Sequence, residues 1–200
     1  MKKFFDLDYQ YQRLLKGIKD LPNKDRIISA LDLAKKAHAG QKRDEGQDYF
    51  IHPVRVANTL VSDLSIKDSD LIVAAILHDT VEDTDTTLQE IKGKFGEKVA
   101  YLVKKLTREK QDDEKEENKF AQKYKKFQEL MKQSNKVRLL KACDLLDNLG
   151  SLPYRKDRGR RFFRHVREAR EMYLPLAKSV NTYIASKMEK IIKTLPKLKD

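Results

Sequence analysis

The chain has little of what many small proteins depend on. Only 1 of its 200 residues is cysteine, which excludes a disulfide framework and any zinc site built from cysteines, and fits a reducing compartment. The longest uninterrupted apolar run, Leu71 to Leu77, is far shorter than a membrane-spanning helix. The N-terminus meets Asp6 and Asp8 too early to form the apolar region of a signal peptide. We therefore expect a soluble, cytoplasmic protein with no membrane partner.

Residues that end or interrupt helices are also scarce. The sequence has 7 glycines and 5 prolines, so it offers few turns and favours long helices over many short strands. Its hydrophobic fraction of 40% is enough for a core, and 200 residues suit one domain. We expect a single all-α domain over residues 1–200.

Basic residues are in excess. Lysine and arginine number 43 against 31 aspartates and glutamates, which gives a formal net charge of +12. Such a charge indicates an anionic partner, and nucleic acid, a membrane surface and a phosphorylated small molecule all satisfy it. Composition alone does not choose among them.

Apolar residues at helical spacing predict most of the helices. The stripe in residues 25–39 predicts one helix, and a second opens near Pro53, where proline suits the first turn. A third is expected to be capped by Asp68 or Ser69. Residues 85–107 predict two short helices separated near Gly93 and Gly96.

The second half of the chain begins with a polar stretch. Residues 108–119 contain no apolar residue and predict a loop or a solvated helix end. Helices are then expected over 119–133 and 137–152, followed by a basic turn that leads into a long helix within 153–180. The tail, 182–200, is amphipathic and ends basic.

The most informative cluster follows the apolar run. His78, Asp79, Glu82 and Asp83 come directly after Leu77. The helix that begins near Asp68 or Ser69 is expected to continue through this cluster, so that His78 and Glu82 share one face and the two aspartates share the adjacent face. Three carboxylates this close repel one another, and a bound cation would relieve the repulsion. The alternative is a solvated acidic helix end.

A second polar site lies among apolar residues. Asp144 is followed one helical turn later by Asn148, and a buried carboxylate needs a metal or a partner such as Lys141. His52 is flanked by apolar residues, and alone it fits a core histidine. Together, two histidines and two aspartates would form a mixed shell for a divalent metal, made of His52, His78, Asp79 and Asp144.

Six segments carry a resemblance to a known family. In chain order they are AHAGQKR, YFIHPVRVA, AAILHDTVEDTDTT, FGEKVAYLVKKLT, LLKACDLLDNLGSL and MYLPLAKSV. They span most of the chain, from roughly residue 30 to residue 180. With them the chain resembles the HD-domain superfamily, named for a His-Asp dyad such as His78–Asp79. It is most similar to the hydrolase domain of RelA/SpoT-type alarmone enzymes, and looks like a stand-alone small alarmone hydrolase.

The resemblance implies a helical HD-domain bundle that removes the 3′-pyrophosphate of guanosine tetra- or pentaphosphate. It implies one manganese ion held by His52, His78, Asp79 and Asp144. It assigns Glu82 and Asp83 to the activation of water, and matches His38 to a recurring family histidine that we expect to be structural. Substrate contacts are implied for Lys42, Arg43, Asn148 and Ser151, although Arg43 also fits a solvated loop charge.

Other functions remain compatible with the sequence. The same site would suit an adenosine alarmone or a phosphorylated dinucleotide such as NADPH. The basic segment RKDRGRRFFRHVREAR, with its two phenylalanines, also resembles an RNA-binding helix. Because Glu168 and Glu171 interrupt its charge, and Phe162 and Phe163 suit packing, we expect no nucleic-acid partner. The sequence does not indicate an oligomeric state.

Overall fold

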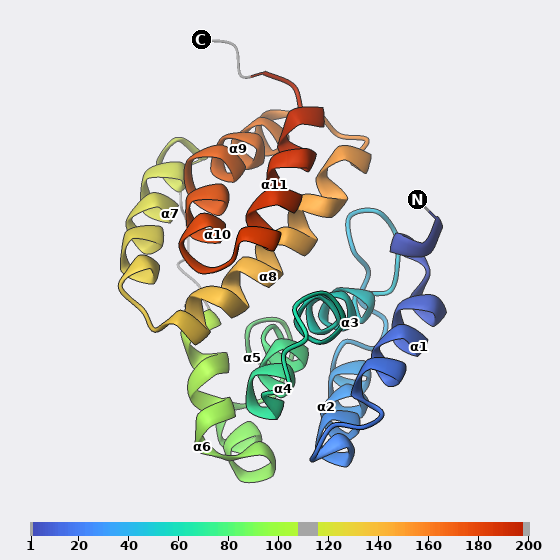
Figure 1. Ribbon diagram of the computed structural model, residues 1–200. Helices are drawn as coiled ribbons and strands as arrows, with labels where there is room; N and C mark the ends of the chain where they lie inside the picture. The colour runs from blue at the N-terminus through green and yellow to red at the C-terminus, as the bar shows by residue number, and fades with distance from the viewer. Residues whose placement is uncertain (1, 108–115, 198–200) are drawn as a thin grey trace. The chain divides into compact units, whose positions relative to one another are not determined.

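Helices make up the regular secondary structure in this computed structural model, which describes residues 2–107 and 116–197 (Figure 1). The described residues contain only one isolated antiparallel bridge, between Lys42 and Asp48. The prediction of an all-α fold is therefore confirmed. The chain divides into two compact units, residues 1–109 and 110–200. The assignment of residues 1–200 to one domain stays a prediction.

The described residues of the first unit, 2–107, form a 3₁₀ turn, six α-helices and a π-helical turn. In chain order these are η1 (Lys2–Phe5), α1 (Leu7–Ile18), α2 (Lys24–Ala37), α3 (Ile51–Asn58), η2 (Thr59–Asp63), α4 (Ser69–Leu77), α5 (Thr80–Asp83) and α6 (Leu88–Leu106).

Helix α4 is the centre of the first unit. It packs against α2, α3 and α6, and the seven residues from Leu71 to Leu77 are all buried. A helix that is apolar on all sides is stable only when other elements surround it. The apolar run that was too short for a membrane is therefore a core helix.

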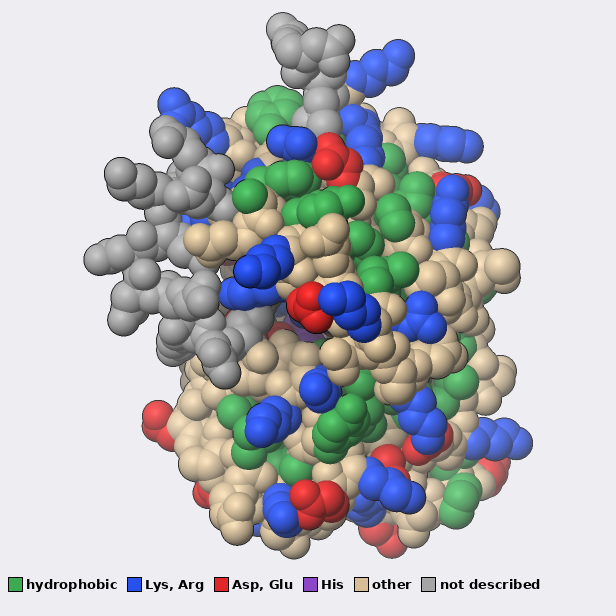
Figure 2. All heavy atoms as spheres, turned by 90° about the vertical axis from the view of Figure 1, so that its left-hand side faces the viewer, with side chains coloured by type: hydrophobic (Ala, Val, Ile, Leu, Met, Phe, Trp, Pro, Cys, Tyr) green, Lys and Arg blue, Asp and Glu red, His purple; other side chains and the backbone are tan. Residues whose placement is uncertain are grey.

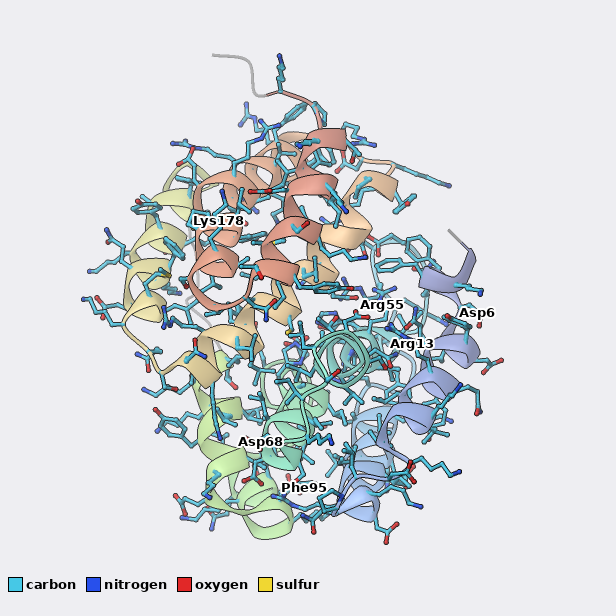
Figure 3. The ribbon with its side chains drawn as sticks, in the orientation of Figure 1. Asp6, Arg13, Arg55, Asp68, Phe95 and Lys178 are labelled. Atoms are coloured by element: carbon cyan, nitrogen blue, oxygen red, sulfur yellow. The ribbon has the colours of Figure 1, made fainter. Side chains whose placement is uncertain are left out.

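Local signals set the helix boundaries in this unit. Asp68, labelled in Figure 3, accepts hydrogen bonds from the backbone N–H groups of Asp70 and Leu71, so the predicted cap of α4 is confirmed. Helix α6 is interrupted at Gly96, whose φ of 81° lies in the left-handed region that favours glycine. The expected pair of helices is thus confirmed at Gly96, whereas Gly93 is helical.

Within residues 116–197, the second unit forms five α-helices and two short helical turns. They are α7 (Glu116–Met131), α8 (Asn135–Ser151), η3 (Leu152–Tyr154), α9 (Arg160–Glu168), the π-helical turn η4 (Ala169–Tyr173), α10 (Leu174–Val180) and α11 (Thr182–Thr194). Helix α8 packs against α7, α10 and α11. The predicted long helix is realised as α9, η4 and α10 in succession. Of the predicted loop 108–119, residues 108–115 lie outside the described part, and the rest begins α7.

The basic excess is visible on the surface. Lysine and arginine side chains are spread across the face shown in Figure 2, with fewer acidic side chains between them. In the described part of the chain, no helix combines the length and the apolar character that a membrane crossing requires.

Candidate metal centre

Two buried histidines of the first unit contact each other edge to face. His52 is the second residue of α3, and His78 directly follows the last residue of α4. Each is 1% exposed, and their Nε2 atoms lie 3.2 Å apart. The packing of α3 against α4 thus brings together two imidazoles that are 26 residues apart in sequence.

Side chains end the apolar helix at this point. The Nδ1 atom of His78 lies 2.8 Å from the carbonyl oxygen of Ala75, and the hydroxyl of Thr80 donates to the carbonyl of Leu77 at 2.7 Å. These bonds satisfy carbonyls that a continuing helix would have used. The expectation of an unbroken helix through His78 and Asp83 is therefore wrong: α4 ends at Leu77, and α5 starts at Thr80.

The hydrogen bond to Ala75 also determines which nitrogen of His78 can bind a cation. A carbonyl only accepts hydrogen bonds, so Nδ1 carries the proton and the lone pair of the neutral ring lies on Nε2. This is the arrangement in which histidines commonly ligate metals, with the other ring N–H held by a carbonyl.

Asp79 adds a carboxylate to the two imidazoles. Its Oδ2 atom lies 3.2 Å from Nε2 of His78 and 3.4 Å from Nε2 of His52. Ligand atoms bound about 2.1 Å from one ion are roughly 3.0–3.4 Å apart for angles between octahedral and tetrahedral. The three donor atoms therefore have the mutual spacing and the N/O chemistry that a divalent transition metal requires.

Tyr49 connects Asp79 to Asp83. Its hydroxyl lies 2.6 Å from Oδ2 of Asp79 and 3.2 Å from Oδ2 of Asp83. Burial, together with the two carboxylates, raises the pKa of Tyr49 far above its ordinary value, so the phenol remains a proton donor. Tyr49 was not among the site residues predicted from the sequence. The only available signal was its position three residues before His52.

His38 and Gln41 support the same region. His38 Nδ1 lies 2.8 Å from Oε1 of Gln41, whose amide nitrogen donates to the backbone carbonyl of Asp83 at 2.8 Å. The ring of His38 stacks on that of Tyr49, with centroids 4.6 Å apart. Burial lowers the pKa of His38 against the opposing effects of Gln41 and the nearby aspartates, which keeps the ring neutral. These contacts agree with the structural role expected for His38.

The remaining predicted residues of the first unit lie on the loop between α2 and α3 and on α5. Lys42 pairs with Asp48, and both side chains are more than half exposed. The guanidinium of Arg43 lies over the ring of Tyr49, 5.6 Å from its centroid, and its side chain is 8% exposed. On α5, Glu82 is half-buried and Asp83 is exposed. Arg43 is therefore a packed side chain rather than a solvated charge.

The other predicted residues lie on α8 of the second unit. Asp144 is buried; Nζ of Lys141 lies 2.7 Å from its Oδ2, and the amide of Asn148 donates to its Oδ1 at 2.6 Å. The alternative of an ion pair with Lys141 is thus confirmed as a contact. Ser151 is fully buried at the end of the helix. Its role as a substrate contact stays a prediction.

Comparison with known proteins gives consistent matches. The chain is 41% identical over 154 residues to a guanosine-3′,5′-bis(diphosphate) 3′-pyrophosphohydrolase of Aquifex aeolicus, covering 76% of this chain and 21% of that protein. It therefore spans about a fifth of the length of that relative. It is also 38% identical over 129 residues to the human protein MESH1, which carries the same enzyme name, covering 64% of this chain and 69% of MESH1.

A solved structure and a family model complete the comparison. The structure is of a metazoan orthologue of SpoT, described as hydrolysing ppGpp. It matches with a TM-score of 0.72 at 28% identity, over 84% of this chain and 94% of that one. The family model described as HD domain matches residues 30–182, a range that contains the two imidazoles and Asp79. The chain belongs to the HD domain family.

Proposed function

We propose that the chain is a metal-dependent hydrolase that removes the 3′-pyrophosphate of guanosine alarmones, giving GDP or GTP and pyrophosphate. The observation that carries the proposal is the spacing of 3.2–3.4 Å among Nε2 of His52, Nε2 of His78 and Oδ2 of Asp79, next to the carboxylate of Asp83. The names of the Aquifex and human relatives support the substrate class.

The metal shell is proposed to consist of His52, His78, Asp79 and Asp144, with manganese as the ion. Imidazole and carboxylate donors suit manganese, iron and zinc more than calcium, which prefers oxygen ligands alone. When bound, the ion would polarise the phosphate and lower the pKa of water, as divalent ions do in hydrolases.

Glu82 and Asp83 are proposed as the carboxylates that take up and pass on the proton of the attacking water. A carboxylate acts as a general base when it lies within hydrogen-bond reach of the proton that it removes. Asp83 is exposed, so water reaches it, and Tyr49 holds it beside Asp79.

Cationic and polar groups would hold the substrate. Arg43 is proposed to contact the nucleotide, because its guanidinium already lies over an aromatic ring, and such planar cations also stack on bases. Lys42 lies beside it on an exposed loop and suits a phosphate. Asn148 and Ser151 are proposed as further contacts.

A substrate panel tests this function. The purified protein with Mn²⁺ is incubated with ppGpp, its adenosine analogue and NADPH, and the products are separated by ion-exchange chromatography. We expect GDP and pyrophosphate from ppGpp in equal amounts. If the folded, metal-loaded protein leaves ppGpp intact, the proposal is wrong, and turnover of only one of the other compounds would reassign the substrate.

A further inference from the structure

The hydroxyl of Tyr49 lies between two carboxylates that have different proposed tasks. It is 2.6 Å from Oδ2 of Asp79, a proposed metal ligand, and 3.2 Å from Oδ2 of Asp83, a proposed proton acceptor. The Oδ2 atom of Asp79 is the same oxygen that approaches both imidazoles. One phenol therefore contacts a carboxylate of the proposed metal shell and a carboxylate proposed for proton transfer.

The hydroxyl of Tyr49 has one proton, which limits the hydrogen bonds that it can donate. The phenol cannot donate fully to both carboxylates at once, and the shorter distance shows that Asp79 receives the stronger bond. A hydrogen bond between a neutral donor and a carboxylate is short and directional. It restricts rotation of the Asp79 carboxylate and leaves the other lone pair of Oδ2 facing the imidazoles.

The ring of Tyr49 is held firmly in this position. His38 stacks on it with an interplanar angle of 26°, and the backbone N–H of Tyr49 donates to the carbonyl of Gln41 at 3.0 Å. Gln41 in turn donates to the backbone carbonyl of Asp83. The loop that carries Tyr49 is thus hydrogen-bonded to the segment 79–83 through the side chains of Gln41 and Tyr49.

We propose that Tyr49 is a positioning residue, which orients Asp79 toward the two imidazoles and keeps Asp83 beside Asp79. This inference rests on the proposed function for the roles of Asp79 and Asp83, and adds a residue to which no task was assigned. Groups that hydrogen-bond to metal ligands commonly change metal affinity or activity by about 10- to 100-fold when they are lost.

The test removes only the hydroxyl. Tyr49→Phe keeps the ring that stacks on His38 and lies under Arg43, so the loop retains its packing. The matched control is Tyr101→Phe, which removes a hydroxyl from a tyrosine that is 48% exposed on α6. Mn²⁺ is titrated into metal-free protein by calorimetry, a measurement that requires no substrate.

We expect Tyr49→Phe to weaken Mn²⁺ binding at least tenfold, whereas Tyr101→Phe binds as the unmodified chain does. With saturating Mn²⁺, kcat for ppGpp should fall at least tenfold, while KM stays within about twofold, because Tyr49 orients carboxylates rather than substrate. A second variant, Asp83→Asn, keeps the bond to Asp79 and should retain Mn²⁺ affinity while kcat falls.

The outcomes separate this inference from the proposed function. Wild-type affinity for Mn²⁺ in Tyr49→Phe would overturn the positioning role, even if ppGpp is the substrate. A tenfold loss of affinity in a protein that leaves ppGpp intact would support the positioning role and contradict only the substrate. Failure of the unmodified chain to bind Mn²⁺ would overturn both.

Discussion

The Nε2 atoms of His52 and His78 face each other at 3.2 Å in the interior of the first unit. The lone pair of His78 lies on Nε2, because its Nδ1 proton is used by the carbonyl of Ala75. Such a pair is favourable only when a proton or a cation lies between the two nitrogens, and Asp79 supplies the balancing charge. This relationship is the basis of the first two predictions.

Asp79→Ala should abolish metal binding. The substitution removes a carboxylate whose Oδ2 atom lies within 3.4 Å of the Nε2 atoms of both imidazoles. We expect Mn²⁺ affinity to fall at least 100-fold and hydrolysis of ppGpp to drop below detection, as measured by calorimetry and product chromatography. Asp85→Ala, an exposed aspartate two residues beyond Asp83, is the control and should retain both properties.

Removal of the metal should stop the reaction, and the activity that returns should depend on which ion is added. Protein treated with a chelator and dialysed is expected to be inactive. Activity should return with Mn²⁺ and to a smaller degree with Fe²⁺ or Zn²⁺, since these ions accept imidazole ligands. Recovery with Ca²⁺ alone would contradict the proposed ligand set, because calcium prefers sites made of oxygen.

Glu168→Ala should destabilise the second unit strongly. Glu168 is fully buried; Lys123 lies 2.8 Å and Arg164 lies 3.3 Å from its Oε1, and the hydroxyl of Tyr173 donates to its Oε2 at 2.7 Å. Removing one partner of a buried ion pair typically costs about 3–5 kcal/mol, because the remaining charges are left uncompensated. Urea denaturation measures the loss.

Glu171→Ala provides the matched control for that prediction. Glu171 pairs with Arg167 at the same i,i+4 spacing by which Glu168 pairs with Arg164, but the Arg167 and Glu171 side chains are both exposed, at 51% and 42%. Exposed pairs contribute about 0.2–1 kcal/mol. Equal losses of unfolding free energy in the two variants would contradict the assignment of Glu168 as a buried charge centre.

His165 should make stability fall at acidic pH. Burial, reinforced by Lys123, Arg155, Arg161 and Arg164, lowers the pKa of His165 to about 3. The unfolded chain, with a histidine pKa near 6.5, binds a proton that the folded chain does not. Between pH 6.5 and pH 3, this residue therefore lowers the free energy of unfolding by up to about 1.4 kcal/mol for each unit of falling pH.

His165→Gln isolates that contribution. The variant has no titrating group at this position, so the slope of unfolding free energy against pH should be shallower than in the unmodified chain below pH 6.5, and equal above it. Urea denaturation at half-unit steps from pH 4 to pH 8 gives both slopes. Identical slopes across the acidic range would show that His165 is not held neutral in the folded protein.

Local pattern predicted much of the fold. The apolar stripe in 25–39 corresponds to α2, which runs from Lys24 to Ala37, and Asp68 caps α4 as expected. These features depend on side-chain spacing and on hydrogen bonds between residues close in sequence, so a single segment contains the required information. Residue type and the apolar residues around them were also sufficient to select His52, His78 and Asp79 as candidate ligands.

The break after Leu77 and the role of Tyr49 could not be predicted in this way. The break depends on whether the side chains of His78 and Thr80 bond to carbonyls of the preceding turn, and helical periodicity does not encode that choice. Tyr49 reaches Asp79 across 30 residues of sequence, through a loop of irregular conformation.

The sequence by itself determined the helical class, the core helix 71–77, the basic charge and the set of chemically capable side chains. Tertiary structure decided which of those side chains of the first unit share one site: the packing of α3 against α4 brings the imidazoles together, and the loop after His38 places Tyr49 on Asp79 and Asp83. The physical reason is the separation along the sequence over which each kind of interaction acts. Periodicity and capping act over a few residues, whereas a metal-binding geometry requires distances accurate to a few tenths of an ångström between segments distant in sequence.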